Sequence, residues 1–154
     1  RQANYHTDHS GASMTFATAN FAQWSARATS RAYAIPWGWL VKAYSATTAT
    51  NSATGIDWPG AGASAFGGFM VYQIFAGNGT ATIKIQHAST NSDGSFADLG
   101  GCTTGSISCS TPTSGLVCTT AQTTSVNRYI RWQIVLGTAT TVTFALGFVR
   151  GYLA

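Results

Sequence analysis

Apolar side chains at every second position are the feature that most constrains how this chain folds. The stretch RYIRWQIVLGTATTVTFALGFVRGY, residues 128–152, shows this alternation on both sides of a short turn at Gly137-Thr138. A period of two is typical of a strand with one buried face. The stretch predicts an antiparallel hairpin that closes a core, with an inward set of Ile130, Trp132, Ile134, Leu136, Val142, Phe144, Leu146 and Phe148.

Strand signals recur upstream, over residues 13–21, 37–45 and 65–77. The stretch 37–45 is expected to place Trp37, Trp39, Val41 and Ala43 on one face. The stretch 65–77 is apolar on both faces, which indicates a central strand covered on both sides. Its Gly67-Gly68 pair predicts a bulge or a close backbone approach.

An Asn78-Gly79 pair follows, and this pair is a strong hairpin signal because both turn residues need positive φ. The next strand should turn Ala81, Ile83 and Ile85 inward, with Thr82, Lys84 and Gln86 outward. A second turn at Asp93-Gly94 precedes a short edge segment. Apart from a weak signal at 21–31, no stretch has a sustained helical period.

These patterns predict an all-β protein, an antiparallel two-sheet β-sandwich of the jelly-roll or Ig-like kind, over residues 36–154. Residues 1–35 are expected to form a less regular N-terminal arm or the end of a preceding domain. The 154 residues suffice for one domain with a real core. Because the chain begins at Arg1, we expect a processed product or a fragment of a longer protein.

Charge is scarce in this chain. Charged residues make up 8% of it, against roughly 25% in an ordinary soluble protein. Five Trp, six Tyr and eight Phe argue against a disordered chain. Since charge is the usual device for keeping a surface soluble, we expect much of this surface to be covered by neighbouring copies.

Two classes of partner are not expected. The net charge is +4, but the eight basic residues are scattered and form no stripe for nucleic acid. The apolar runs are much shorter than the roughly 20 residues that a membrane helix needs.

Three cysteines, Cys102, Cys109 and Cys118, lie in one Thr/Ser/Gly-rich stretch. Further Cys or His ligands at short offsets are missing, so the pattern does not predict a metal site. A Cys102–Cys109 or Cys109–Cys118 disulfide is expected of a protein outside the reducing cytosol. The third thiol would be buried or would pair between chains.

Titratable groups crowd together once, at His6, Asp8 and His9. A metal site there would need Asp57 or His87 as a third ligand, and a hydrolase would use Asp57 together with the same three residues. The alternative is a polar turn in which Asp8 accepts backbone hydrogen bonds. Asp93 and Asp98 lie in or beside a turn and do not form the carboxylate pair of a hydrolase. The sequence therefore predicts neither an enzyme nor a cofactor.

The tryptophans allow two interpretations. Trp37, Trp39 and Trp58, with Tyr44 and Tyr72, would form a stacking platform for sugar rings if they were exposed together. Trp37 and Trp39 share one face of a predicted strand, which favours burial in the core or in a subunit contact. A carbohydrate-binding β-sandwich module is thus the alternative function.

Four motifs carry a resemblance to a known family. They are IKIQHAS (83–89), DGSFADL (93–99), VNRYIR (126–131) and TFALGFVR (143–150). Together with the upstream segment, they resemble a β-sandwich domain of tailed-bacteriophage virion proteins, such as the outer domain of a major tail protein or a capsid decoration module. The cysteine-bearing stretch 100–119 departs from that family's pattern.

The resemblance implies a non-enzymatic structural protein of the virion, packed against copies of itself and other virion proteins, with cell-surface glycans as a further class of partner. Arg128, Arg131 and Arg150 would then emerge at the edges of the closing hairpin. There they would bond to a neighbour's carbonyl oxygens or aspartates. Trp37 and Trp39 would be further residues of the subunit contact. The alternative for each arginine is a solvated side chain along the sheet.

Overall fold

The computed structural model describes residues 2–7, 10–15, 38–57 and 62–151. The chain divides into two compact units, residues 1–34 and residues 35–153. The first contains an antiparallel hairpin of β1 (Gln2–Thr7) and β2 (Ser10–Thr15). The predicted strand at 13–21 overlaps β2, whereas β1 was not predicted.

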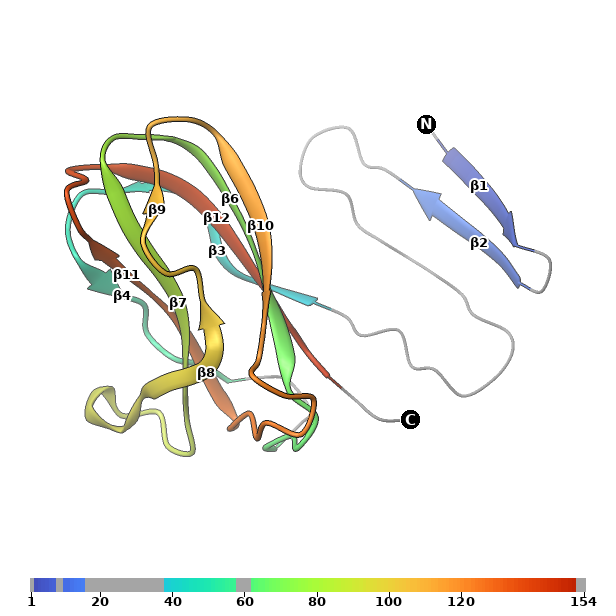
Figure 1. The fold of residues 1–154 in the computed structure, drawn as a ribbon. Coiled ribbons are helices and arrows are strands. Elements are labelled where there is room, and N and C mark those ends of the chain that lie inside the picture. Colours follow the sequence, from blue (N-terminus) through green and yellow to red (C-terminus); the bar gives the residue numbers. More distant parts are fainter. Residues whose placement is uncertain (1, 8–9, 16–37, 58–61, 152–154) are drawn as a thin grey trace. The chain divides into compact units, whose positions relative to one another are not determined.

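The second unit is a sandwich of two antiparallel sheets, which confirms the predicted fold (Figure 1). One sheet has the order β10-β6-β12-β3, from β3 (Gly38–Thr47), β6 (Gly68–Gly77), β10 (Thr113–Cys118) and β12 (Val142–Arg150). The other has the order β4-β11-β7-β8, from β4 (Asn51–Ser52), β7 (Thr80–Ala88), β8 (Ala97–Thr103) and β11 (Tyr129–Leu136). In addition, β5 (Ile56–Asp57) pairs with β11 and β9 (Ile107–Ser108) pairs with β7. A 3-10 turn, η1 (Asp93–Ser95), precedes β8.

The core lies between the two sheets, and the predicted inward positions of β7, β11 and β12 supply most of it. The fully buried apolar side chains include Met70, Ile74, Ile83, Ile85, Ile130, Ile134, Phe144, Leu146 and Phe148. Trp132 and Phe144 join the sheets through an edge-to-face contact with ring centroids 5.6 Å apart. Burial of each such side chain contributes about 2 kcal/mol before the entropy of ordering is subtracted.

The predicted Asn78-Gly79 hairpin turn joins β6 to β7 and packs against the turn between β11 and β12. Gly79 has φ +58°. The Asn78 side chain accepts hydrogen bonds at Oδ1 from the backbone N–H of Thr140 (2.9 Å) and of Thr141 (3.2 Å). Two turns far apart in sequence are thereby joined at one end of the sandwich.

The prediction for 37–45 is wrong beyond Val41. The register between β12 and β3 shifts on both sides of Leu146. Because of this irregularity Val41 and Lys42 are both buried, whereas Ala43 is exposed. Gly68 does approach a neighbouring backbone closely, since a Cβ there would meet the carbonyl oxygen of Val149 at 2.5 Å.

Candidate interaction surfaces

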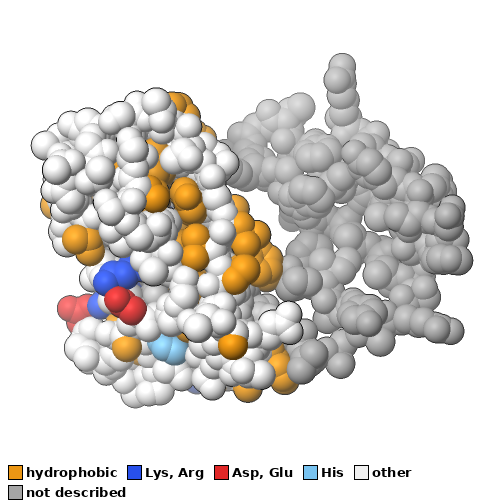
Figure 2. All heavy atoms as spheres, viewed as in Figure 1, with side chains coloured by type: hydrophobic (Ala, Val, Ile, Leu, Met, Phe, Trp, Pro, Cys, Tyr) orange, Lys and Arg blue, Asp and Glu red, His pale blue; other side chains and the backbone are white. Residues whose placement is uncertain are grey.

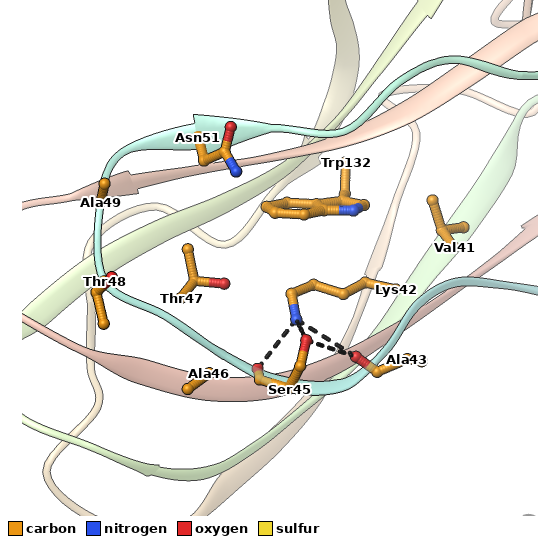
Figure 3. Close-up of a pocket in the computed structure, with 10 residues that line it drawn as sticks. All are labelled: Val41, Lys42, Ala43, Ser45, Ala46, Thr47, Thr48, Ala49, Asn51 and Trp132. Carbon is orange, nitrogen blue, oxygen red and sulfur yellow. Dashed lines mark hydrogen bonds between the residues drawn. The ribbon is translucent and has the colours of Figure 1, made fainter.

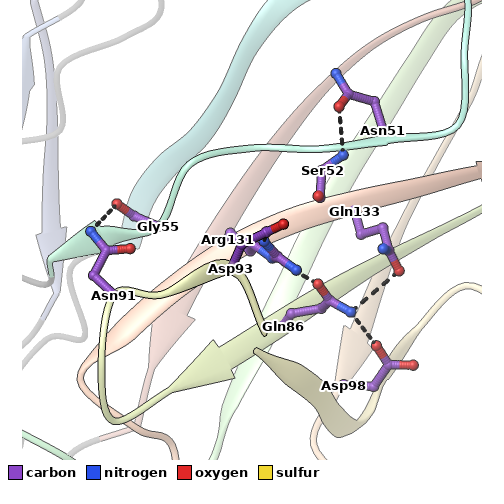
Figure 4. Close-up of polar contacts among 9 residues, drawn as sticks. All are labelled: Asn51, Ser52, Gly55, Gln86, Asn91, Asp93, Asp98, Arg131 and Gln133. Atoms are coloured by element: carbon purple, nitrogen blue, oxygen red, sulfur yellow. Dashed lines mark hydrogen bonds and ion pairs between the residues drawn. The ribbon is translucent and has the colours of Figure 1, made fainter. Parts of the chain in front are cut away.

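The outer face of the β4-β11-β7-β8 sheet carries a connected set of charged and amide side chains, here called the polar face: Lys84, Gln86, Asp98, Arg131 and Gln133. Strand alternation turns these residues outward while their sequence neighbours enter the core. The register places Arg131 opposite Gln86 and Gln133 opposite Lys84. Figure 4 shows Gln86 between Arg131, Gln133 and Asp98.

Hydrogen bonds run through the polar face from end to end. Arg131 donates from Nε to Gln86 Oε1 at 2.8 Å. Gln86 Nε2 donates to Asp98 Oδ1 at 2.8 Å and to Gln133 Oε1 at 3.3 Å. Lys84 pairs with Asp98 at 2.7 Å, and Arg131 pairs with Asp93. Each of these charged groups is therefore paired within the chain, and the network links η1 and the edge strand β8 to β7 and β11.

The electrostatics of Asp98 follow from these contacts. Partial burial raises the pKa of the carboxyl group. Hydrogen bonds from Lys84 and Gln86, together with the charge of Lys84, outweigh burial and leave the pKa below its usual value. Asp98 is therefore an ionised anchor for two donors and not a proton donor for catalysis near neutral pH.

Arg150 lies inside the molecule, so the expectation that it emerges at an edge is wrong. It is fully buried. Its guanidinium donates to the carbonyl oxygens of Gly62 (2.6 Å), Asn127 (2.7 Å) and Arg128 (3.3 Å). Carbonyl oxygens were the expected kind of acceptor, but they belong to its own chain. Arg150 ties the end of β12 to two loops.

The other two arginines differ from each other. Arg131 is 6% exposed, with its guanidinium 4.3 Å from the centroid of the Phe96 ring, so its predicted emergence at the edge is also wrong. Arg128 is exposed and lies over the Tyr129 ring at 5.3 Å. A subunit contact through Arg128 stays a prediction.

A cavity of about 500 Å³ lies between β3 and the β4-β11 edge of the other sheet, and Figure 3 shows its lining. Lys42, 6% exposed, reaches into it beside Trp132. Its Nζ donates to Ser45 Oγ (2.6 Å), to Ser45 O (3.0 Å) and to Ala43 O (3.3 Å). It also lies 4.4 Å from the centroid of the Phe144 ring.

The contact between Lys42 and Ser45 has the residue types of a serine–lysine catalytic pair. Burial lowers the pKa of Lys42, and a neutral amine would be the active base. The three oxygen acceptors and the ring faces instead favour the ammonium form. Among the described residues that line the cavity, Lys42 is the titratable one. We therefore assign Lys42 a structural role between the sheets.

Several predicted site residues lie outside the described residues: Asp8, His9, Trp37 and Trp58. Within the described ranges, His6 lies in β1 and Asp57 in β5. His87 on β7 accepts a hydrogen bond at Nδ1 from the backbone N–H of Asn127, at 3.1 Å. Across these ranges, no group of three His, Cys, Asp or Glu residues is placed to hold a metal ion.

The described aromatic residues do not form one platform. Trp39 and Tyr72 are half-buried and pack against the core. Tyr44 is 58% exposed and packs edge-on against Phe75, with ring centroids 4.8 Å apart. Trp39 thus packs against the core from a half-buried position, and the glycan platform stays a prediction that rests on Trp37 and Trp58.

The predicted disulfides are wrong, since all three cysteines are free thiols. Cys109 donates its backbone N–H to Gly79 O at one end of β6, whereas Cys118 is paired with Phe69 near the other end. At a rise of about 3.3 Å per residue these positions are more than 20 Å apart, well beyond the roughly 7 Å that a disulfide spans. The register of β7 likewise puts more than about 10 Å between Cys102 and Cys109.

The cysteines also differ in reactivity. Burial, with a smaller contribution from Cys118, raises the pKa of Cys102 to about 12. Burial also raises the pKa of Cys109. Cys118 is the exposed thiol.

The outer face of the β10-β6-β12-β3 sheet is apolar and carries no charged side chain; it is called the neutral face below. Its large side chains are Leu40, Tyr44, Phe69, Val71, Phe75, Leu116 and Val149. The two basic residues of these strands, Lys42 and Arg150, are both buried. In Figure 2, hydrophobic side chains form a band along the side that carries β10, away from the cluster of charged groups.

A hollow of about 680 Å³ extends the neutral face at the end of the sheet where Cys118 of β10 is paired with Phe69 of β6. Its described lining includes the apolar residues Phe66, Phe69 and Cys118 and the polar residues Thr119, Gln122 and Thr123. Apolar walls without a converging set of charges suit an apolar side chain better than an ionic substrate. Sequence reasoning missed this surface, although the two-sided apolar pattern of residues 65–77 was its signal.

Within the described ranges, no helix has the length and apolar character that crossing a bilayer requires. In comparisons with known proteins, no family model matches this chain and no curated protein sequence matches it.

Proposed function

We propose that this chain is a non-enzymatic structural protein of a tailed-phage virion, built to assemble in many copies as a tail or capsid surface module. Its work is to present a rigid β-sandwich and to bury uncharged surface between subunits. The resemblance of residues 83–150 to virion β-sandwich domains supports this proposal, and the protein would act within an extracellular particle.

The observation that carries the proposal is the distribution of charge. Of the charged side chains that the structure describes, Lys84 pairs with Asp98 and Arg131 with Asp93. Lys42 and Arg150 are buried against oxygen acceptors, and Arg128 lies over a ring. Apart from the exposed Arg128, these ionic groups are bonded within the fold, and the outer face of the β10-β6-β12-β3 sheet carries no charged side chain. Such surfaces are typical of proteins that pack against other proteins.

Immunogold electron microscopy of the native source tests the proposal. An antibody raised against the folded chain should label particles or tubes at regularly repeated positions. Label confined to free molecules, with none on any particle, would contradict it.

A further inference from the structure

The neutral face is unusual because its centre is as apolar as a core. Val71 is paired in register with Leu116 on β10 and with Gly147 on β12, and Gly147 is paired with Leu40 on β3. This row crosses all four strands. Leu40, Val71 and Leu116 are 52%, 43% and 58% exposed. Contiguous exposed apolar patches on a soluble protein mark interaction sites.

The outer faces of the two sheets differ sharply in polarity. The polar face bonds its charged groups to one another, whereas the neutral face has few polar side chains, among them Ser114, Gln73 and Thr143. β6 lies inside its sheet, between β10 and β12, and has apolar residues on both sides. Its sequence is that of a strand covered on both faces. Only the inner face is covered by the described residues of the sandwich.

We infer that the neutral face is where a second copy of this chain docks, sheet against sheet. The inference rests on the proposed function and names the surface that carries it. Two copies of a chain with net charge +4 repel each other. None of the described basic side chains lies on the neutral face: Lys42 and Arg150 are turned inward, Arg131 and Lys84 lie on the other sheet, and Arg128 directly precedes its strand β11.

The surface shape and the area of the neutral face suit a second copy of the chain. Gly147 on β12 has no side chain and is paired with the larger Val71 on β6 and Leu40 on β3, so a large side chain of a facing sheet has room to pack over it. Four strands about 4.8 Å apart, at a rise of about 3.3 Å per residue, cover roughly 500 Å². Two stacked copies would bury at least about 1,000 Å², the lower bound for a specific interface.

Two matched substitutions test the inference. Val71→Lys places a charge at the centre of the neutral face. Val135→Lys is the control, because Val135 is 38% exposed on β11, also the second strand of its sheet, but on the polar side. Sedimentation velocity over a range of protein concentrations measures self-association, and circular dichroism checks the fold of each variant.

Self-association of the full chain should weaken at least about tenfold in Val71→Lys and stay unchanged in Val135→Lys. If Val71→Lys misfolds, Leu116→Lys on the edge strand β10 replaces it in the test, and the same weakening of self-association is expected. Unchanged association in Val71→Lys or Leu116→Lys would overturn the docking face and leave the proposed function standing.

A wild-type chain that stays monomeric at every concentration would overturn both proposals. If the wild-type chain is monomeric and both Val71→Lys and Leu116→Lys lower its melting temperature, another part of the same chain covers the neutral face.

Discussion

Val71 and Leu116 stand side by side on the outer face of neighbouring strands, paired in register and each about half exposed. Side chains of this type, at the centre of a sheet, are normally found under a second layer. The remaining residues of the row, Gly147 and Leu40, leave the patch apolar to the far edge strand. Val71 and Leu116 therefore form the centre of the surface on which we infer that a second copy docks.

Arg150→Met should destabilise the fold by about 3 kcal/mol or more, because the buried side chain loses its charge-assisted hydrogen bonds to the carbonyl oxygens of Gly62 and Asn127. Arg128→Met is the control, and its cost should stay below about 1 kcal/mol because the side chain is exposed. Urea unfolding of the two variants measures the difference. Equal losses would mean that the buried guanidinium is not a structural tie.

Gly79→Ala should cost more stability than Gly105→Ala. Both glycines have positive φ, +58° and +64°, so both variants suffer backbone strain of about 1 kcal/mol. At Gly79 the new Cβ would also meet the backbone of Thr138 at 2.6 Å, whereas at Gly105 nothing lies within 4 Å. Thermal unfolding compares them, and a Gly105→Ala loss as large as that of Gly79→Ala would contradict the packed-turn account.

Stability should fall as the pH drops below about 6.5, the usual pKa of histidine in an unfolded chain. Burial, and then the charge of Arg150, lowers the pKa of His87 in the folded protein. The unfolded chain therefore binds the proton first, so the contribution of His87 is present above this pH and is lost as the pH falls through the folded-state pKa.

His87→Asn is the matched variant for this pH dependence, since an amide oxygen can take the place of Nδ1 and accept from Asn127 without titrating. Its free energy of unfolding should depend less on pH than that of the wild type between neutral and mildly acidic conditions. Identical pH profiles for the two proteins would show that His87 is not responsible.

The alternating patterns predicted most of the fold. The inward sets of β7, β11 and β12 were identified because a period of two fixes which residues enter the core. The Asn78-Gly79 turn was identifiable because few dipeptides tolerate its backbone. What pattern reasoning missed depends on pairing between strands, as at Lys42, where the irregular register of β3 turns a charged side chain inward.

The candidate surfaces were harder to predict. Arg131 and Arg150 read as surface residues because their partners, Gln86 and the carbonyl oxygens of distant loops, are far away in sequence. The three cysteines read as a disulfide set because they are close in sequence, yet the sandwich places Cys109 and Cys118 near opposite ends of β6. Spacing along the sequence says little about which residues are close in space when long antiparallel strands separate them.

Labelling of Cys118 tests the central claim most directly. Cys118 is exposed beside Phe69 on the neutral face, while Cys102 and Cys109 are buried thiols with raised pKa values. A water-soluble thiol reagent applied to the native wild-type chain therefore reports on this face alone. If copies meet there, the labelling rate of Cys118 should fall as protein concentration rises and self-association proceeds. A rate that stays constant while sedimentation shows association would contradict the claim.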